Sequence, residues 1–348
     1  MMPRRPMRAR ARSGTSLATA IGALLVTGLS ACPRAAEGPP PRPWKVTLLK
    51  LDDGAETQAV VDSFVDELRK SSAQPDMDYT VTVQSAHGSA VDLPGLAAAA
   101  VRDGAHTLVA IGTPALQAAR AAAQTTPVVF TDVANPALAG VEPRGIWRRW
   151  LPFLFAPERP PVTGAYAAED FTPLLDASSG MVNGRLGAVV VGADRDALGY
   201  RDALRQAADW SSRSVDFEMA GGAADVGPAA ARLCGRGAVA LVALGDRAST
   251  AAFEALMQGA RACGIPVFGT LRAHAEGGAT VTFARDANGA AREAGRMVAR
   301  LARGERPDDI AVAALARTSL IVNAGAAEEA NVGIPFALIQ KADQVLGD

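Results

Sequence analysis

Residues 108–119 read LVAIGTPALQAA, an apolar run followed by a Gly-Thr-Pro turn and an alanine-rich segment. A short apolar run bounded by turn residues is typical of a buried strand. Thr113 is a favourable N-cap residue and Pro114 suits the first turn of a helix, so the spacing predicts a helix over 114–123. The stretch therefore predicts one strand–turn–helix unit of an α/β fold.

The same alternation continues on both sides of this unit, as expected for parallel α/β architecture. In the first half we expect strands at 44–51, 79–84, 107–111 and 127–131, and helices at 57–70, 93–102 and 114–123. The pattern restarts at Arg185, with strands expected at 186–191, 215–219, 238–244 and 266–268 and helices at 198–210, 226–233 and 249–262. Roughly 300 residues after the N-terminal segment exceed one typical core, which predicts two lobes.

The N-terminal residues predict export and lipid anchoring. An arginine-rich segment precedes the apolar run 17–29, which is too short to span a membrane comfortably. Leu29-Ser30-Ala31-Cys32 resembles the lipobox of bacterial lipoproteins, in which the cysteine carries a diacylglyceryl group after cleavage. We expect a lipoprotein signal peptide over 1–31 and an extracytoplasmic protein anchored to the membrane at Cys32. The alternative is an ordinary secretory signal, which would also export the chain.

The composition after the expected signal peptide indicates a linker, a class of partner that is excluded and a pair of cysteines. Residues 32–43 are proline-rich and predict an extended linker before a folded part that begins at Trp44. The net charge is -1, and basic residues interleave with acidic ones, which argues against nucleic-acid binding. Cys234 and Cys263 could form a disulfide in an oxidising compartment, or be two small buried apolar side chains, the interpretation that we favour.

The sequence contains none of the common enzyme motifs that we sought. It contains no G-x-S-x-G elbow, no G-x-x-x-x-G-K loop and no G-x-G-x-x-G after a strand. His87, His106 and His274 lack metal-ligand spacing; His106 is expected to be structural, whereas His87 and His274 could line a cleft. We therefore expect a protein that is not an enzyme and uses no cofactor.

Several segments occur in a characteristic order along nearly the whole exported chain. They are 108–119, PVVFTDVANP at 127–136 with Gly140, PVTG at 161–164, GIPVF at 264–268, 291–304 and 333–345. This order resembles the ABC-transporter substrate-binding lipoproteins of the tryptophan/tyrosine-type family. The resemblance implies a type I periplasmic-binding-protein fold, with two doubly wound parallel-sheet lobes, three crossovers and a ligand cleft between the lobes. The lobes implied are 44–163 with 284–310, and 164–283 with 311–348.

Ligands in such folds lie beyond the carboxyl ends of parallel strands, where loops and helix N-termini converge. The candidate ligand-binding residues are Asp52, Asp53, Gly112, Thr113, Asp132 and Asn135 in the first lobe, and Asp194, Asp246, Arg247, Thr270, Arg272, Arg285 and Asp286 in the second lobe or at the second crossover. Thr113 and the backbone N–H groups that follow it predict a site for a carboxylate, although Thr113 could be a plain N-cap.

The sequence departs from the family pattern in these loops. Ala134-Asn135 stand where Thr-Asp is common, Arg247 stands for Asn, and Ala284-Arg285 stand for Asp and Tyr. Arg247, Arg272 and Arg285 would then face Asp52, Asp53 and Asp132. We hypothesise a ligand with an anionic group held by an arginine fork. The alternative is that the arginines are solvated, or pair with the aspartates when the cleft closes.

One further segment is atypical for the family, the aromatic and basic stretch GIWRRWLPFLF at 145–155. It could dock a permease or lie against lipid headgroups, or it could pack on its own lobe. The resemblance implies a monomeric solute-binding protein of an ABC importer, which captures a small polar, amino acid-like or anion-bearing solute and docks on an ABC permease. The alternative function is an envelope lipoprotein that acts as a sensor or protein-interaction module without solute uptake.

Overall fold

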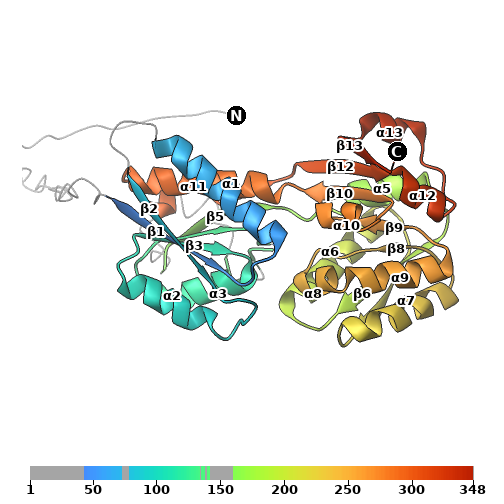
Figure 1. Cartoon of the computed structure of the whole chain (residues 1–348), viewed down its shortest axis with the longest axis horizontal. Coiled ribbons are helices and arrows are strands. Elements are labelled where there is room, and N and C mark those ends of the chain that lie inside the picture. The colour runs from blue at the N-terminus through green and yellow to red at the C-terminus, as the bar shows by residue number, and fades with distance from the viewer. Residues whose placement is uncertain (1–42, 73–77, 134, 138, 142–159, 348) are drawn as a thin grey trace, which may run out of the picture. The chain divides into compact units, whose positions relative to one another are not determined.

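The computed structural model describes residues 43–72, 78–133, 135–137, 139–141 and 160–347. The expected signal peptide at 1–31, Cys32, the linker up to residue 42 and the aromatic segment 145–155 lie outside the described residues. The described residues all belong to the compact unit Pro40–Asp348, which contains two β-sheets (Figure 1).

The first sheet has the order β11-β5-β4-β3-β1-β2, and every pair in it is parallel. Its strands are β1 (Trp44–Lys50), β2 (Tyr79–Ser85), β3 (Thr107–Ile111), β4 (Val128–Thr131), β5 (Val162–Ala167) and β11 (Ala313–Leu315). Leu48 pairs with Val83 of β2 on one side and with Val109 of β3 on the other. The carboxyl ends of these strands therefore meet at one edge.

Helices cover both faces of the first sheet because successive side chains of each strand point to opposite faces. Val46, Leu48 and Val109 pack with α1 (Ala55–Ser72) and α11 (Ala287–Ala302). Leu49 and Leu108 pack with α2 (Leu93–Arg102) and α3 (Thr113–Ala122) on the other side. The C-terminal half of the chain thus supplies α11 to the first lobe, in line with the segment 284–310 that the family resemblance assigns to that lobe.

The second sheet has the order β13-β12-β10-β9-β8-β6-β7. Its strands are β6 (Arg185–Val191), β7 (Val215–Ala220), β8 (Ala238–Val242), β9 (Val267–Gly269), β10 (Val281–Arg285), β12 (Thr318–Asn323) and β13 (Gln344–Leu346). Its helices are α5 (Thr172–Ser179), α6 (Arg195–Trp210), α7 (Val226–Gly235), α8 (Arg247–Ala251), α9 (Phe253–Cys263), α10 (Arg272–Glu276), α12 (Ala324–Glu329) and α13 (Phe336–Lys341). All pairs are parallel except β10 with β12.

The predicted α/β class with two doubly wound lobes is confirmed, with three differences of detail. The eight expected strands lie within two residues of those observed. The helix expected at 249–262 is divided at Ala252 into α8 and α9. The chain also passes from one sheet to the other later than the expected boundaries 163/164, 283/284 and 310/311. β5 belongs to the first sheet and continues to Ala167, β10 belongs to the second sheet and continues to Arg285, and β11 still belongs to the first sheet.

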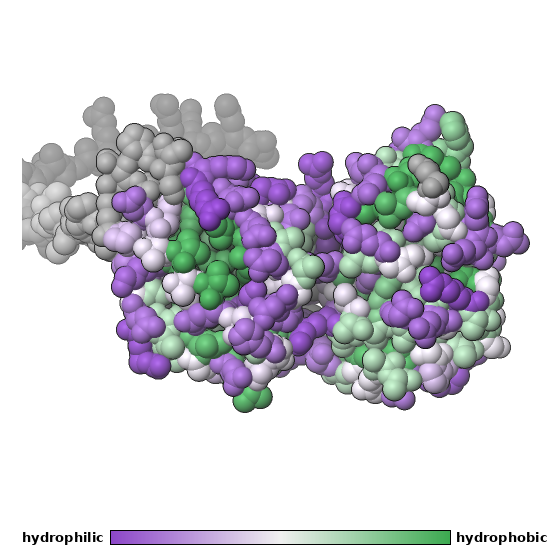
Figure 2. Space-filling view, viewed as in Figure 1, coloured by the Kyte–Doolittle hydropathy of each residue, from purple (hydrophilic) through white to green (hydrophobic). Residues whose placement is uncertain are grey.

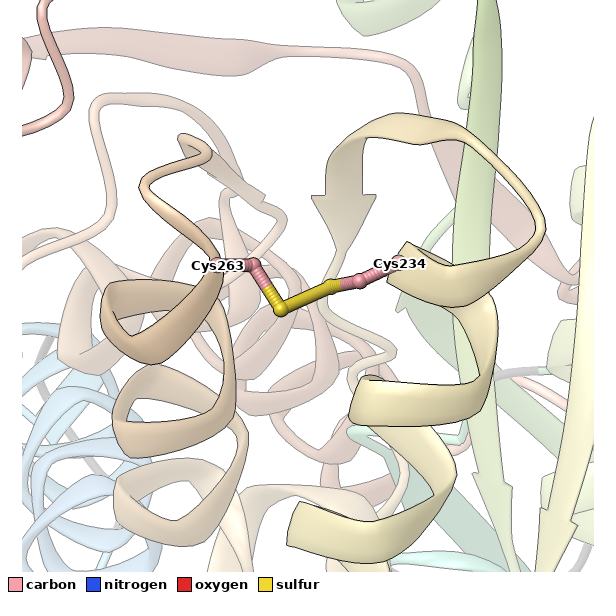
Figure 3. Close-up of a disulfide and its surroundings, with 2 residues drawn as sticks. All are labelled: Cys234 and Cys263. Carbon is pink, nitrogen blue, oxygen red and sulfur yellow. A yellow bond between two sulfur atoms is a disulfide. The ribbon is translucent and has the colours of Figure 1, made fainter.

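The second lobe contains a disulfide between Cys234 and Cys263 (Figure 3). Cys234 is the residue before the last of α7 and Cys263 is the last residue of α9. A Cβ added at Gly259 of α9 would lie 2.6 Å from the Cβ of Ala230 in α7. This close helix approach brings the cysteines together. Our expectation of two unpaired buried side chains is therefore wrong.

The described helices include none with the length and apolarity that crossing a membrane requires.

Candidate ligand-binding site

Arg285, the last residue of β10, lies at the centre of a buried charge cluster. Its Nη1 donates to Oδ1 of Asp132 at 2.9 Å, and its Nε lies 3.6 Å from Oε2 of Glu169. Asp132 follows β4 and Glu169 follows β5, whereas Arg285 belongs to the second sheet. The side chains of Arg285 and Glu169 are only 10% and 8% exposed. Both sheets therefore contribute to one buried cluster.

Burial sets the ionisation of this cluster. It raises the pKa of Glu169 to about 7, although Arg285 nearby acts in the opposite direction. Burial also disfavours the charge on Arg285, but Tyr200, Asp132 and Glu169 outweigh that effect and raise its pKa. Arg285 is therefore charged at all physiological pH values, while Glu169 titrates near neutrality.

Two further carboxyl groups approach Arg285 from the first turns of helices. Oε1 of Glu56 in α1 accepts the N–H of Ala273 at 3.3 Å, and desolvation of the carboxyl raises its pKa although the residue as a whole is exposed. Burial likewise raises the pKa of Asp196 in α6, against hydrogen bonding from Thr113. Arg285 acts electrostatically on both carboxyls. The Arg285 guanidinium thus interacts electrostatically with four carboxyl groups, those of Glu56, Asp132, Glu169 and Asp196.

The loop after β9 is fixed by a buried histidine. Nδ1 of His274 accepts the backbone N–H of Thr270 at 3.2 Å, and its ring stacks on Phe253. Burial lowers the pKa of His274 to about 3, so this imidazole is neutral. His274 therefore positions Thr270 beside the cluster and does not itself carry charge.

Several buried polar atoms here have no hydrogen-bond partner among the described residues. They are Oε2 of Glu169, Oγ1 of Thr270, Oδ2 of Asp246 and Nε of Arg285, of which the Glu169 and Arg285 atoms face each other as an ion pair at 3.6 Å. Thr270 is 2% exposed and Asp246 is 4% exposed. A buried polar group without a partner costs free energy, so these atoms are candidates to contact a bound solute.

An outer pair of charges links the same two lobes. Nε of Arg247, at the start of α8, lies 3.5 Å from Oδ2 of Asp52, and both side chains are partly exposed. Asp53 beside it pairs with Lys50 at 3.0 Å and with Nδ1 of His87 at 2.6 Å. Hydrogen bonds from Lys50 and His87 lower the pKa of Asp53 to about 2.

The structure brings Asp132, Thr270 and Arg285 together and gives other candidates local roles. Asp194, Asp246 and Asp286 accept backbone N–H groups as N-caps of α6, α8 and α11, and Asn135 accepts the N–H of Ala137. Arg272 instead donates to Gln344 of β13 at 2.7 Å. Whether these residues bind ligand stays a prediction.

Thr113 differs from the expected N-cap. Gly112, with φ at 83°, occupies the N-cap position of α3 without a side-chain bond, and Thr113 is the first helical residue. Positive φ favours glycine at this turn. The Thr113 hydroxyl is therefore free to interact with Asp196.

The residues that the sequence analysis missed are Glu56, Glu169, Asp196 and Tyr200. Glu169 follows β5, which lies at the expected lobe boundary 163/164 where the sequence analysis predicts no strand, so Glu169 is not recognised there as a strand-end residue. Glu56 and Asp196 lie in the first turns of helices, where acidic side chains are common because they stabilise the helix. Their place in the sequence therefore does not distinguish them from ordinary helix-stabilising residues.

Comparison with known proteins adds a family resemblance over the second part of the chain. Residues 185–346, from β6 to β13, match the model of the ABC transporter substrate binding protein family. Comparison with curated proteins gives no sequence match.

Solved structures share the fold over most of the chain. A conserved domain protein from Vibrio cholerae is 22% identical, with a TM-score of 0.74 over 86% of this chain and 99% of that one. An ABC domain from Streptococcus pneumoniae in complex with L-Trp is 16% identical, with a TM-score of 0.74 over 87% and 100%. A ligand-free, open substrate-binding protein with adhesive properties from Clostridium difficile is 20% identical, with a TM-score of 0.66 over 87% and 99%.

That family is described as one of substrate-binding proteins of ABC transporters. Residues 185–346 thus resemble the ABC transporter substrate binding protein family, and the solved structures show that the chain has the type I periplasmic-binding-protein fold.

Proposed function

We propose that this chain is the solute-binding component of an ABC importer and holds a small polar solute at the Arg285 cluster. The observation that carries the proposal is the buried Arg285–Asp132 pair, in which each sheet supplies one partner beside unpartnered polar atoms. The L-Trp complex of the Streptococcus pneumoniae domain supports a solute of similar size.

Capture needs no chemical step. The solute enters between the lobes, the lobes close at their crossovers, and the closed form docks on the permease. Micromolar affinity requires about -8 kcal/mol, which a few charge-assisted hydrogen bonds and one buried apolar group supply after the cost of closure.

A surface of the second lobe is suited to contact with a protein such as the permease. Figure 2 shows apolar residues gathered over α13 and β13, where Phe336, Ile339 and Val345 are exposed. Contiguous exposed apolar residues are typical of interaction sites.

The arginine fork expected for an anionic solute finds less support than its alternative. Arg285 and Arg247 lie against Asp132 and Asp52, the pairing that we considered for a closed cleft. Arg272 contacts Gln344 and lies 4.0 Å from Glu276.

Anchoring at Cys32 is part of the proposal and has a direct test. We expect the full chain to sediment with membranes and to enter the detergent phase, because acyl chains bury many methylene groups in the bilayer. The Cys32→Ser chain should be released into the soluble fraction, whereas Cys234→Ser should remain with the membrane. A Cys32→Ser chain that stays membrane-bound would show that another segment anchors the protein.

Solute binding is tested by a thermal-shift screen of the purified full chain against amino acids, carboxylates, amines and nucleosides, with calorimetry on each hit. The Arg285→Met chain should lose the shift, and the matched surface variant Arg205→Met should keep it. The Asp132→Asn chain provides a second measurement if Arg285→Met does not fold. A folded protein with no hit in the screen would contradict the proposal and favour the sensor or protein-interaction alternative.

A further inference from the structure

We propose that the solute is an amine without a carboxylate, held through its cationic nitrogen by the carboxyl groups around Arg285. This inference rests on the proposed solute-binding function and specifies its chemical class. It reverses the anionic ligand expected from the sequence.

The groups suited to receive a solute carboxylate are already engaged by carboxylates of the protein. Thr113 and the N-terminus of α3 face Asp196, which Thr113 stabilises by hydrogen bonding. Arg285 is bonded to Asp132 at 2.9 Å and lies 3.6 Å from Glu169. An amino acid would therefore bring its carboxylate against existing carboxylates, where like charges repel.

The charge balance of the cluster favours a cation. Glu56, Asp132, Glu169 and Asp196 surround Arg285, the one guanidinium that acts on all four. Burial raises the pKa of three of these carboxyls, Glu56, Glu169 and Asp196, which shows that their charged forms lack compensation. A bound ammonium or guanidinium would supply the missing charge through charge-assisted hydrogen bonds.

The unpartnered atoms match the same chemistry. Oε2 of Glu169, Oδ2 of Asp246 and Oγ1 of Thr270 are all able to accept a hydrogen bond, and each is at least nine-tenths buried by residue or side chain. Nε of Arg285 is a donor and the Thr270 hydroxyl can also donate, whereas the ionised carboxylate oxygens of Glu169 and Asp246 only accept. An ammonium group has three N–H donors and no acceptor, so it satisfies this set better than a carboxylate does.

Matched probe pairs test the proposal on the purified full chain. Each pair is an amino acid and the amine that lacks its carboxylate: L-tryptophan and tryptamine, L-tyrosine and tyramine, L-arginine and agmatine, L-lysine and cadaverine. We expect calorimetry at neutral pH to show at least one amine binding ten-fold or more tightly than its amino acid.

Other outcomes separate this inference from the proposed function. An amino acid that binds as tightly as its amine would overturn the amine class and leave solute binding intact. The same conclusion follows if none of the eight probes binds but the broader screen finds a solute that is not an amine. A folded chain that binds nothing overturns both.

Variants of the chain show whether the carboxyl groups make the distinction. Glu169→Gln should weaken amine binding at least ten-fold, whereas Glu254→Gln, the same change at an exposed residue of α9, should not. Asp196→Asn should improve the amino acid relative to its amine several-fold, because Thr113 and the N-terminus of α3 become available to a carboxylate. Unchanged selectivity in both Glu169→Gln and Asp196→Asn would contradict the proposal.

Discussion

Glu169 gives the protein a pH-dependent stability that one substitution can isolate. Its pKa in the folded protein, about 7, is raised from the ordinary value of 4.5 chiefly by burial. Its stabilising contribution is therefore fully present below pH 4.5 and is lost as pH rises through 7. At 1.36 kcal/mol per pKa unit, the loss amounts to roughly 3 kcal/mol.

We expect Glu169→Gln to lose less unfolding free energy than the parent chain between pH 4.5 and 8. Chemical denaturation at several pH values measures this difference, and Glu254→Gln should follow the parent chain. Parallel pH profiles for the parent and Glu169→Gln would show that Glu169 does not titrate in this range.

Gly164 in β5 lies so close to Phe130 of β4 that a larger side chain would not fit, which the sequence motif PVTG alone does not show. A Cβ at this position would lie 2.5 Å from Cδ1 of Phe130 and closer still to the Phe130 carbonyl oxygen. Gly164→Ala should lower the unfolding free energy by about 1 to 3 kcal/mol, because neither group can move without disturbing β4.

The matched control is Gly95→Ala in α2, where an added Cβ meets nothing within 4 Å. That variant should be more stable by about 0.5 to 1 kcal/mol. Equal stability of the two variants in urea denaturation would show that the Gly164–Phe130 contact relaxes easily.

At residue scale, the sequence was enough to predict which loops contribute to the site, but not which side chains pair with each other in it. Asp132, Thr270 and Arg285 could be found because each lies at or after a recognisable apolar strand. Their partners could not, because ion pairs between residues 153 positions apart, such as Asp132 and Arg285, depend on how the two sheets face each other. The pattern of one strand carries no information about that.

At element scale, the disulfide joins the C-terminal ends of α7 and α9. It closes a loop with a sequence separation of 29, for which chain entropy predicts a stabilisation of about 3.5 kcal/mol. We expect reduction, or the double change Cys234→Ala and Cys263→Ala, to lower the unfolding free energy by that order. Denaturant titration with and without reductant measures it, and reductant should have no further effect on the double variant. Cys32 is the one cysteine left in the double variant, so a reductant effect that persists there would show that the loss of stability does not come from the Cys234–Cys263 bond.

The long, regular elements could be predicted from the sequence, and the short ones could not. β3 and α2 match their expected bounds because apolar periodicity and flanking turn residues mark both ends. β11 and β13 have only three residues each, too few for any periodicity, and they form because neighbouring strands offer unpaired edges. The break at Ala252 was hidden by continuous helix-forming residues.

At the scale of the whole molecule, polar contacts link the two lobes. They include Arg285 with Asp132, Arg247 with Asp52, and the N–H of Ala273 with Glu56. Polar contacts exchange for water at modest cost, whereas a large apolar interface would resist opening, so hinge motion about the crossovers is expected.

A bound solute that neutralises the cluster should shift this equilibrium towards the closed form, because it binds both lobes only there. Small-angle X-ray scattering of the Cys32→Ser chain should then show a smaller radius of gyration at saturating solute. The Asp132→Asn chain should need more solute for the same change, while Glu254→Gln should behave as the Cys32→Ser parent. If calorimetry reports saturation while the radius of gyration stays constant, the two lobes do not move relative to each other when they bind solute. A permease would then have to recognise the solute or surface residues of the protein instead of the closed form.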